Sequence, residues 1–176
     1  LGIFRIDKNG RIDSTFGING LAKTDSVTHL GTNFNNFKKA GISKSGEIYV
    51  GGIENLDSTI YYPIGVIYKF TSNGNRSQTF GTNGKKIFNR DVLSIIELIG
   101  VLPDNRIIIK GFGTDNQNIS KLMCLNPNGT IDFSFGNSGR VSLLPEYNHT
   151  ELIITPDGKI LLFGENQQHG SFIDCF

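Results

Sequence analysis

The phrase Phe133-Ser134-Phe135-Gly136-Asn137-Ser138-Gly139 decides the fold of this chain, because it closes a pattern that is written three times. The earlier copies are Ser14-Thr15-Phe16-Gly17-Ile18-Asn19-Gly20 and Gln78-Thr79-Phe80-Gly81-Thr82-Asn83-Gly84. Each copy follows an asparagine-glycine pair by the same distance, and these pairs are Asn9-Gly10, Asn73-Gly74 and Asn128-Gly129. A whole structural unit therefore recurs, and tandem recurrence on this scale predicts a repeat architecture.

Composition limits what the chain can be. It has 176 residues, 38% of them apolar and 19% charged, which is enough to bury a real core. Seventeen basic and sixteen acidic residues give a formal net charge of +1, without long runs of one sign. We therefore expect no nucleic-acid partner. The apolar runs have the length of strands and not of membrane helices, so we expect no membrane insertion.

A second landmark gives each repeat a hairpin. Short turns separate pairs of apolar runs rich in β-branched residues, at Ser43–Gly46, Leu102–Asn105 and Thr155–Gly158. Proline, glycine and asparagine stand where tight turns need a fixed or a positive φ. Two further strand-like runs lie before each hairpin, so every repeat is predicted to supply four strands and almost no helix. Several of these strands are apolar on both faces, which is typical of sheets packed between other sheets, as in the blades of a β-propeller.

The residues resemble a known family, the delta-60 repeat proteins of bacteria. The third repeat is the most similar, through Asn126–Gly136 and Thr155–Gly164. The second repeat departs from the family pattern at Arg76-Ser77, and the first departs at Lys44-Ser45. The resemblance implies a propeller-forming repeat protein that bacteria secrete or display at the cell surface, and it implies no defined biochemical role.

We interpret the chain as a single repeat domain, 1–176, with units at about 1–63, 64–118 and 119–170. Residues 171–176 are then the first strand of a further unit. Three units are too few for a closed propeller, which usually has four to eight blades. We expect further repeats or self-association to complete the ring. The alternative three-fold architecture is a β-trefoil, which also has four strands per unit.

No constellation of residues predicts catalysis, a metal site or a cofactor. The three histidines, His29, His149 and His169, lack the spacing of metal ligands. Asp13 and Asp132 occupy equivalent places in two repeats, which favours turn capping over chemistry. We therefore expect no catalytic residue, no metal and no cofactor.

The repeated phenylalanines and the two cysteines are interpreted structurally. Because Phe16, Phe80 and Phe135 recur in every repeat, we expect them to pack between units rather than to bind a ligand. Two cysteines are too few for a disulfide scaffold, and we expect Cys124 and Cys175 to be free thiols that are buried or partly buried. The alternative is a disulfide between them, which would join neighbouring units and would need their strands to lie unusually close.

The most informative residues for function are those that do not repeat. Gly10 and Gly74 lie 64 residues apart, whereas Gly74 and Gly129 lie 55 apart. The extra residues of the first repeat fall in 21–40 and 53–63, two connections that a four-stranded meander places at the same face. Loops of this kind carry function on rigid scaffolds. The candidate ligand-binding residues are Tyr61, Tyr62, Phe34 and Phe37, although Phe34 and Phe37 can instead extend the buried side of the third strand.

These observations predict a non-catalytic binding or spacer module of a bacterial cell-surface or secreted protein, which displays loops for protein or glycan recognition. Two alternatives stay open. One is an enzyme, for example a glycan-degrading one, with its site at the propeller centre. The other is a purely structural role.

Overall fold

The computed structural model describes residues 2–24, 37–55, 63–114, 119–145, 147–166 and 170–175. Over these ranges the chain is all-β, as predicted, and no helix is long and apolar enough to cross a membrane. The strands are β1 (Gly2–Phe4), β2 (Leu21–Lys23), β3 (Phe37–Ile42), β4 (Ile48–Asn55), β5 (Pro63–Phe70), β6 (Lys85–Ile87), β7 (Ile95–Val101), β8 (Ile107–Phe112), β9 (Lys121–Leu125), β10 (Arg140–Ser142), β11 (Tyr147–Ile154), β12 (Ile160–Asn166) and β13 (Gly170–Cys175).

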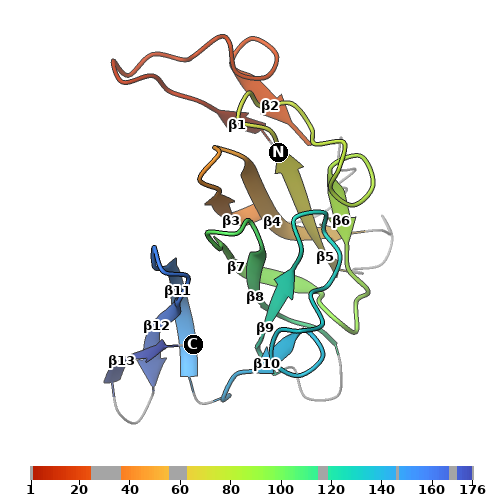
Figure 1. Cartoon of the computed structure of the whole chain (residues 1–176), viewed down its shortest axis with the longest axis vertical. Coiled ribbons are helices and arrows are strands. Elements are labelled where there is room, and N and C mark those ends of the chain that lie inside the picture. The colour runs from red at the N-terminus through yellow and green to blue at the C-terminus, as the bar shows by residue number, and fades with distance from the viewer. Residues whose placement is uncertain are drawn as a thin grey trace.

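The strands form four antiparallel sheets that follow one another along an open arc (Figure 1). Their orders are β1-β2, β3-β4-β5-β6, β7-β8-β9-β10 and β11-β12-β13. Successive four-stranded meanders that stack face to face are β-propeller blades, so the predicted fold class is confirmed. The arc formed by the described residues does not close into a ring.

The grouping of strands into sheets differs from the sequence interpretation. Each repeat supplies four strands, as predicted, but these four do not form one sheet: the second sheet joins the hairpin of the first repeat, β3 and β4, to the first two strands of the second repeat. Strand length explains the difference. β4 and β5 each have eight residues and pair along their full length, whereas β6 pairs with β5 at only three positions. Joining the two long strands satisfies the most backbone hydrogen bonds.

The glycine that ends each phrase belongs to a two-residue hairpin turn. In the second repeat Asn83 and Gly84 have φ values of 49° and 75°, and Thr82 and Lys85 exchange backbone hydrogen bonds of 2.8 and 3.0 Å. Positive φ at both central residues defines a type I′ turn, which asparagine and glycine adopt most easily. The same turn occurs at Asn19-Gly20 and Ser138-Gly139.

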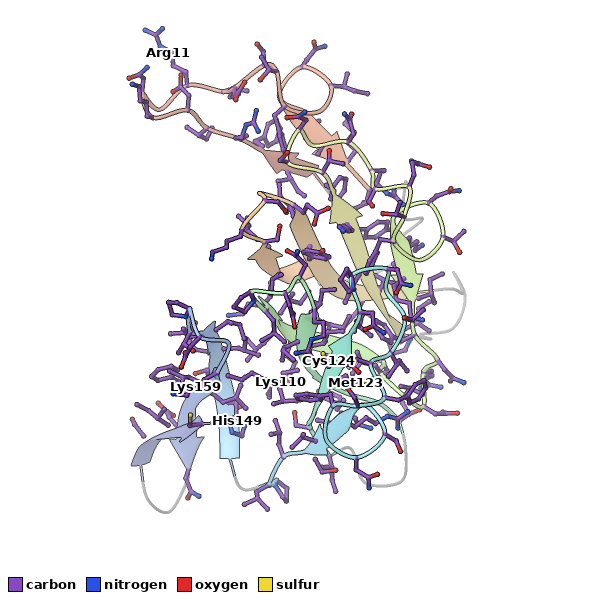
Figure 2. The ribbon with its side chains drawn as sticks, in the orientation of Figure 1. Arg11, Lys110, Met123, Cys124, His149 and Lys159 are labelled. Carbon is purple, nitrogen blue, oxygen red and sulfur yellow. The ribbon has the colours of Figure 1, made fainter. Side chains whose placement is uncertain are left out.

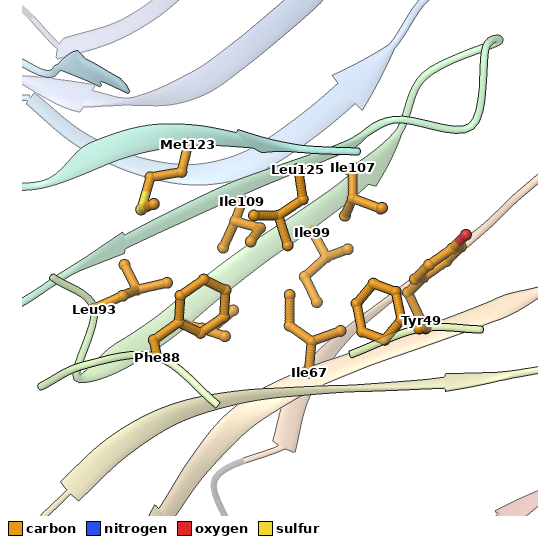
Figure 3. Packing of buried hydrophobic residues seen from close by; sticks show 11 residues of the cluster. Tyr49, Ile67, Phe88, Leu93, Ile99, Ile107, Ile109, Met123 and Leu125 are labelled. Carbon is orange, nitrogen blue, oxygen red and sulfur yellow. The ribbon is translucent and has the colours of Figure 1, made fainter. Parts of the chain in front are cut away.

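The apolar core is formed by side chains that pack between neighbouring sheets. Three apolar clusters fill the three gaps between neighbouring sheets, and Figure 3 shows the cluster between the second and third. There the ring of Phe80 lies edge-on to Tyr49, with centroids 5.8 Å apart. Phe16 and Phe80 are fully buried and Phe135 is partly buried, each within one such cluster. The prediction that these phenylalanines pack between units is therefore confirmed.

The repeated phenylalanine-glycine phrase and the asparagine-glycine turn meet at these same junctions between sheets. The backbone N–H of Gly17 donates to the carbonyl of Asn73 at 2.7 Å, and that of Gly81 donates to Asn128 at 2.9 Å. The first and second phrases are thus hydrogen-bonded to the asparagine-glycine turn of the next repeat. This contact explains why the landmarks keep a constant distance within each repeat, because both ends of the unit must fit its neighbours.

The cysteines agree only in part with expectation. Both are free thiols, and Cys124 is buried, where burial raises its pKa to about 12. Cys175 was expected to be at least partly buried but is exposed. The reason lies in the repeat: Cys175 is equivalent to Cys124, but no further sheet in the described residues covers its face of β13.

Candidate binding hollows

Of the four candidate ligand-binding residues predicted from the sequence, the structure describes only Phe37, and only its backbone. Phe34, Tyr61 and Tyr62 lie outside the described residues. Phe37 begins β3 and pairs with Gly52 on β4, so its backbone does extend the third strand of the repeat. The structure does not describe the side chain of Phe37.

A hollow recurs once in every repeat, beside the type I′ turn and the short strand that follows it. We call these the first, second and third hollows. The first is lined by Phe4, Gly17, Ile18, Asn19, Leu21, Ala22, Lys23, Gly74, Asn75 and Arg76. The second is lined by Arg76, Gln78, Gly81, Thr82, Asn83, Lys85, Lys86 and Ile87. The third is lined by Phe133, Asn137, Ser138, Arg140, Val141 and Ser142.

The hollows are positively charged although the chain as a whole is almost neutral. Arg76, Lys85 and Lys86 line the second hollow, Arg140 lines the third, and Lys23 joins Arg76 in the first. None of the three sets of described lining residues includes an aspartate or a glutamate. The nearly equal numbers of basic and acidic residues are therefore unevenly placed around these hollows. Glu54, behind the lining of the second hollow, balances Lys85, so the charges left to attract anions there are those of Arg76 and Lys86.

Buried contacts hold the basic groups of the second hollow in place. The buried carboxylate of Glu54 accepts from Lys85 Nζ at 2.6 Å and also from the hydroxyl of Tyr68. Arg76 donates to the carbonyl of Asn83 at 2.8 Å, and its guanidinium lies 4.6 Å from the centre of the Tyr68 ring. A cation stacked on an aromatic ring and tied to backbone has few conformations to lose on binding.

The predicted turn-capping acids take no part in these hollows. Asp13 accepts from the backbone and hydroxyl of Thr15 at 3.0 and 2.6 Å, and Asp132 accepts from Ser134 at 3.0 and 2.6 Å. Hydrogen bonds from Ser134 and Arg106 hold the pKa of Asp132 at about 2. Both aspartates therefore cap turns, as the sequence predicted.

The inner edge of the arc contains a second set of charged residues. β7 contacts both β3 and β11, so the first strands of the three larger sheets converge. Glu97 accepts from Lys110 at 2.5 Å, and Lys110 also donates to the carbonyl of His149 at 3.1 Å (Figure 2). Glu151 lies 3.9 Å from Lys39 of β3. Each of these two carboxylates thus faces a lysine.

The sequence reasoning missed the hollows, although a signal was present. Position 76 is arginine where the other repeats have Ile12 and Ile131. Position 133 is phenylalanine where the others have Ser14 and Gln78. These departures lie inside the repeated part of the sequence, whereas the insertions that predicted a binding surface lie outside it.

One family comparison bears on the fold. Residues 102–135 match the model of the domain of unknown function (DUF5122) beta-propeller. The matched segment runs from the turn between β7 and β8, through β9, to Phe135 at the sheet junction. It supports a β-propeller repeat family. No curated protein gives a significant match to the chain.

Proposed function

We propose that this chain is a non-catalytic binding module of a bacterial secreted or cell-surface protein, and that it recognises a glycan or a protein. The observation that carries the proposal is the recurrence of one solvent-open, basic hollow in each of the three repeats. Equivalent sites on a rigid array engage an extended ligand at several points, which raises avidity without new contacts. The blades hold the hollows in fixed relative positions.

The delta-60 resemblance adds the cellular setting to this proposal. Its motifs at Asn126–Gly136 overlap the segment that matches the β-propeller family. A secreted or surface location follows from the resemblance, and such a location suits a module that binds extracellular polymers. The ion pairs of the inner edge favour binding over the enzyme alternative, because Glu97 and Glu151 are each opposed by a lysine.

Glycan and protein arrays probed with the full chain test the proposal. We expect binding that falls when Lys86→Gln changes the second hollow. A parallel variant, Tyr61→Ala/Tyr62→Ala, tests the loop that the sequence singled out. Loss of signal only in the loop variant would move the site to the loop, and an absence of signal on both arrays would reject the binding role.

A further inference from the structure

The third hollow combines a cation with an exposed aromatic ring. It is lined by a polar turn, Asn137 and Ser138, by Arg140 and Ser142 of the short strand β10, and by Phe133. The turn is rigid, because Asn137 and Arg140 exchange backbone hydrogen bonds of 2.8 and 3.2 Å. The backbone therefore fixes the base of the Arg140 side chain.

Arg140 differs from Arg5 and Arg106, which pair with aspartates, and from Arg76, which shares a buried, unpartnered Nε but donates to the carbonyl of Asn83. Arg106 donates to Asp132 at 2.8 Å, and Arg5 lies 2.8 Å from Asp13. The Nε of Arg140 is buried without a hydrogen-bond partner, and the described part of the chain offers its guanidinium neither a hydrogen bond nor an ion pair. A buried donor of a charged group left unsatisfied is costly and calls for a partner.

Phe133 supplies the second half of the arrangement. Its side chain is 71% exposed, and the equivalent residues Ser14 and Gln78 show that the fold does not require an aromatic residue there. Pockets that recognise small polar ligands combine apolar or aromatic surface with a few fixed polar groups. A sugar ring presents a C–H face to an aromatic ring and hydroxyl groups to a polar turn.

We propose that the third hollow binds a carboxylate-bearing sugar of an acidic polysaccharide, an inference that rests on the proposed binding function. Arg140 pairs with the sugar carboxylate, for which the planar guanidinium offers two parallel donors. Phe133 packs against the ring of the same sugar, and Asn137 and Ser138 contact its hydroxyl groups. The basic second hollow, in the preceding repeat, binds another carboxylate-bearing sugar of the same polysaccharide.

Calorimetric titration of the full chain with tri-galacturonic acid tests this inference. Its methyl ester is the matched neutral probe, because esterification removes the charge and keeps the sugar. We expect the free acid to bind at least about tenfold more tightly than the ester, and Arg140→Gln to remove most of that preference, a loss of about tenfold. Phe133→Ser should weaken the binding of both the free acid and the ester, because each packs the same sugar ring against Phe133. Lys44→Gln, which removes one charge from an exposed turn, should change neither.

Three results of the titrations themselves would overturn the inference, and two results of competition experiments would reassign the hollow. The three are no binding of the free acid, equal binding of acid and ester, and a preference that Arg140→Gln leaves intact. A polyglutamate probe that competes as well as the acid would assign the hollow to acidic protein instead, and a chondroitin sulfate fragment that competes better would assign it to sulfate. Equal binding of acid and ester overturns the acidic specificity and leaves the binding function standing. Matching circular dichroism and urea midpoints exclude unfolding as the cause of a loss.

Discussion

Asp132 illustrates how a residue chosen for a turn also governs stability. Its carboxylate caps the turn at Ser134 and pairs with Arg106, and these contacts lower its pKa from 3.8 to about 2. A carboxyl whose pKa is lower in the folded state stabilises the fold above its unfolded pKa. This contribution is lost as the pH falls through the folded pKa.

We therefore expect the urea midpoint of the wild-type chain to fall between about pH 4 and pH 2. Asp132→Asn keeps an acceptor for Ser134 but cannot carry the charge, so it should be less stable at pH 6 and should lose less on acidification. Urea unfolding at a series of pH values measures both effects. An equal loss in the two proteins over this range would show that other carboxyl groups dominate.

At the scale of the turn, glycines of similar φ should differ sharply in their tolerance of a side chain. Gly81 has φ of +53°, and an added Cβ would lie 2.2 Å from the carbonyl oxygen of Lys85. Gly10 has φ of +79°, and an added Cβ would meet nothing within 4 Å. We expect Gly10→Ala to cost about 1 kcal/mol, from backbone strain alone.

Gly81→Ala should cost at least about 3 kcal/mol, because the backbone of the turn must also move. The free energy of unfolding in urea distinguishes the two variants. Similar costs would mean that the turn relaxes easily, which would contradict the tight contact with Asn128 in the next repeat.

Between elements, the buried phenylalanines should dominate stability. Phe80 fills the gap between two sheets and touches Tyr49, so Phe80→Ala leaves a cavity and should cost about 3–5 kcal/mol. Phe133 lies in the neighbouring copy of the same phrase but is exposed, so Phe133→Ala should change stability by less than about 0.5 kcal/mol. Equal effects in thermal or urea unfolding would contradict the assignment of Phe80 to the core.

The sequence predicted the strands and turns well because these depend on neighbours in the chain. Turn chemistry at Asn83-Gly84 and apolar runs such as Ile107–Ile109 are local signals. Which strands pair is a non-local question. The connections 56–62 and 88–94 have the same length, so loop length did not reveal that β4 pairs with β5 while β6 and β7 belong to different sheets. The hollows had a local signal, because Phe133 and Arg140 stand only seven residues apart on either side of one turn, but that signal lies inside the repeated phrase and not in an insertion.

At the scale of the whole molecule, the two ends of the arc present unlike apolar faces. Phe4 and Ile6 are 57% and 55% exposed, although Tyr68 and Phe70, at the equivalent positions of the next repeat, are fully buried against a neighbouring sheet. At the other end Ile173 is 63% exposed. The first sheet thus exposes the apolar face that, in the next repeat, packs against the preceding sheet. The last sheet exposes an apolar residue, Ile173, at the opposite end of the arc.

Faces of this kind are complementary, so we expect the chain to associate head to tail. Sedimentation velocity should give a mass above the monomer value of 19.3 kDa that rises with concentration. Phe4→Glu/Ile6→Glu should restore the monomer, because burying two carboxylates at the junction is costly. Ile42→Glu, at an exposed position on an interior sheet, should leave the association unchanged. A monomer at every concentration would show that these faces do not bind each other, and completion of the ring would then depend on further repeats.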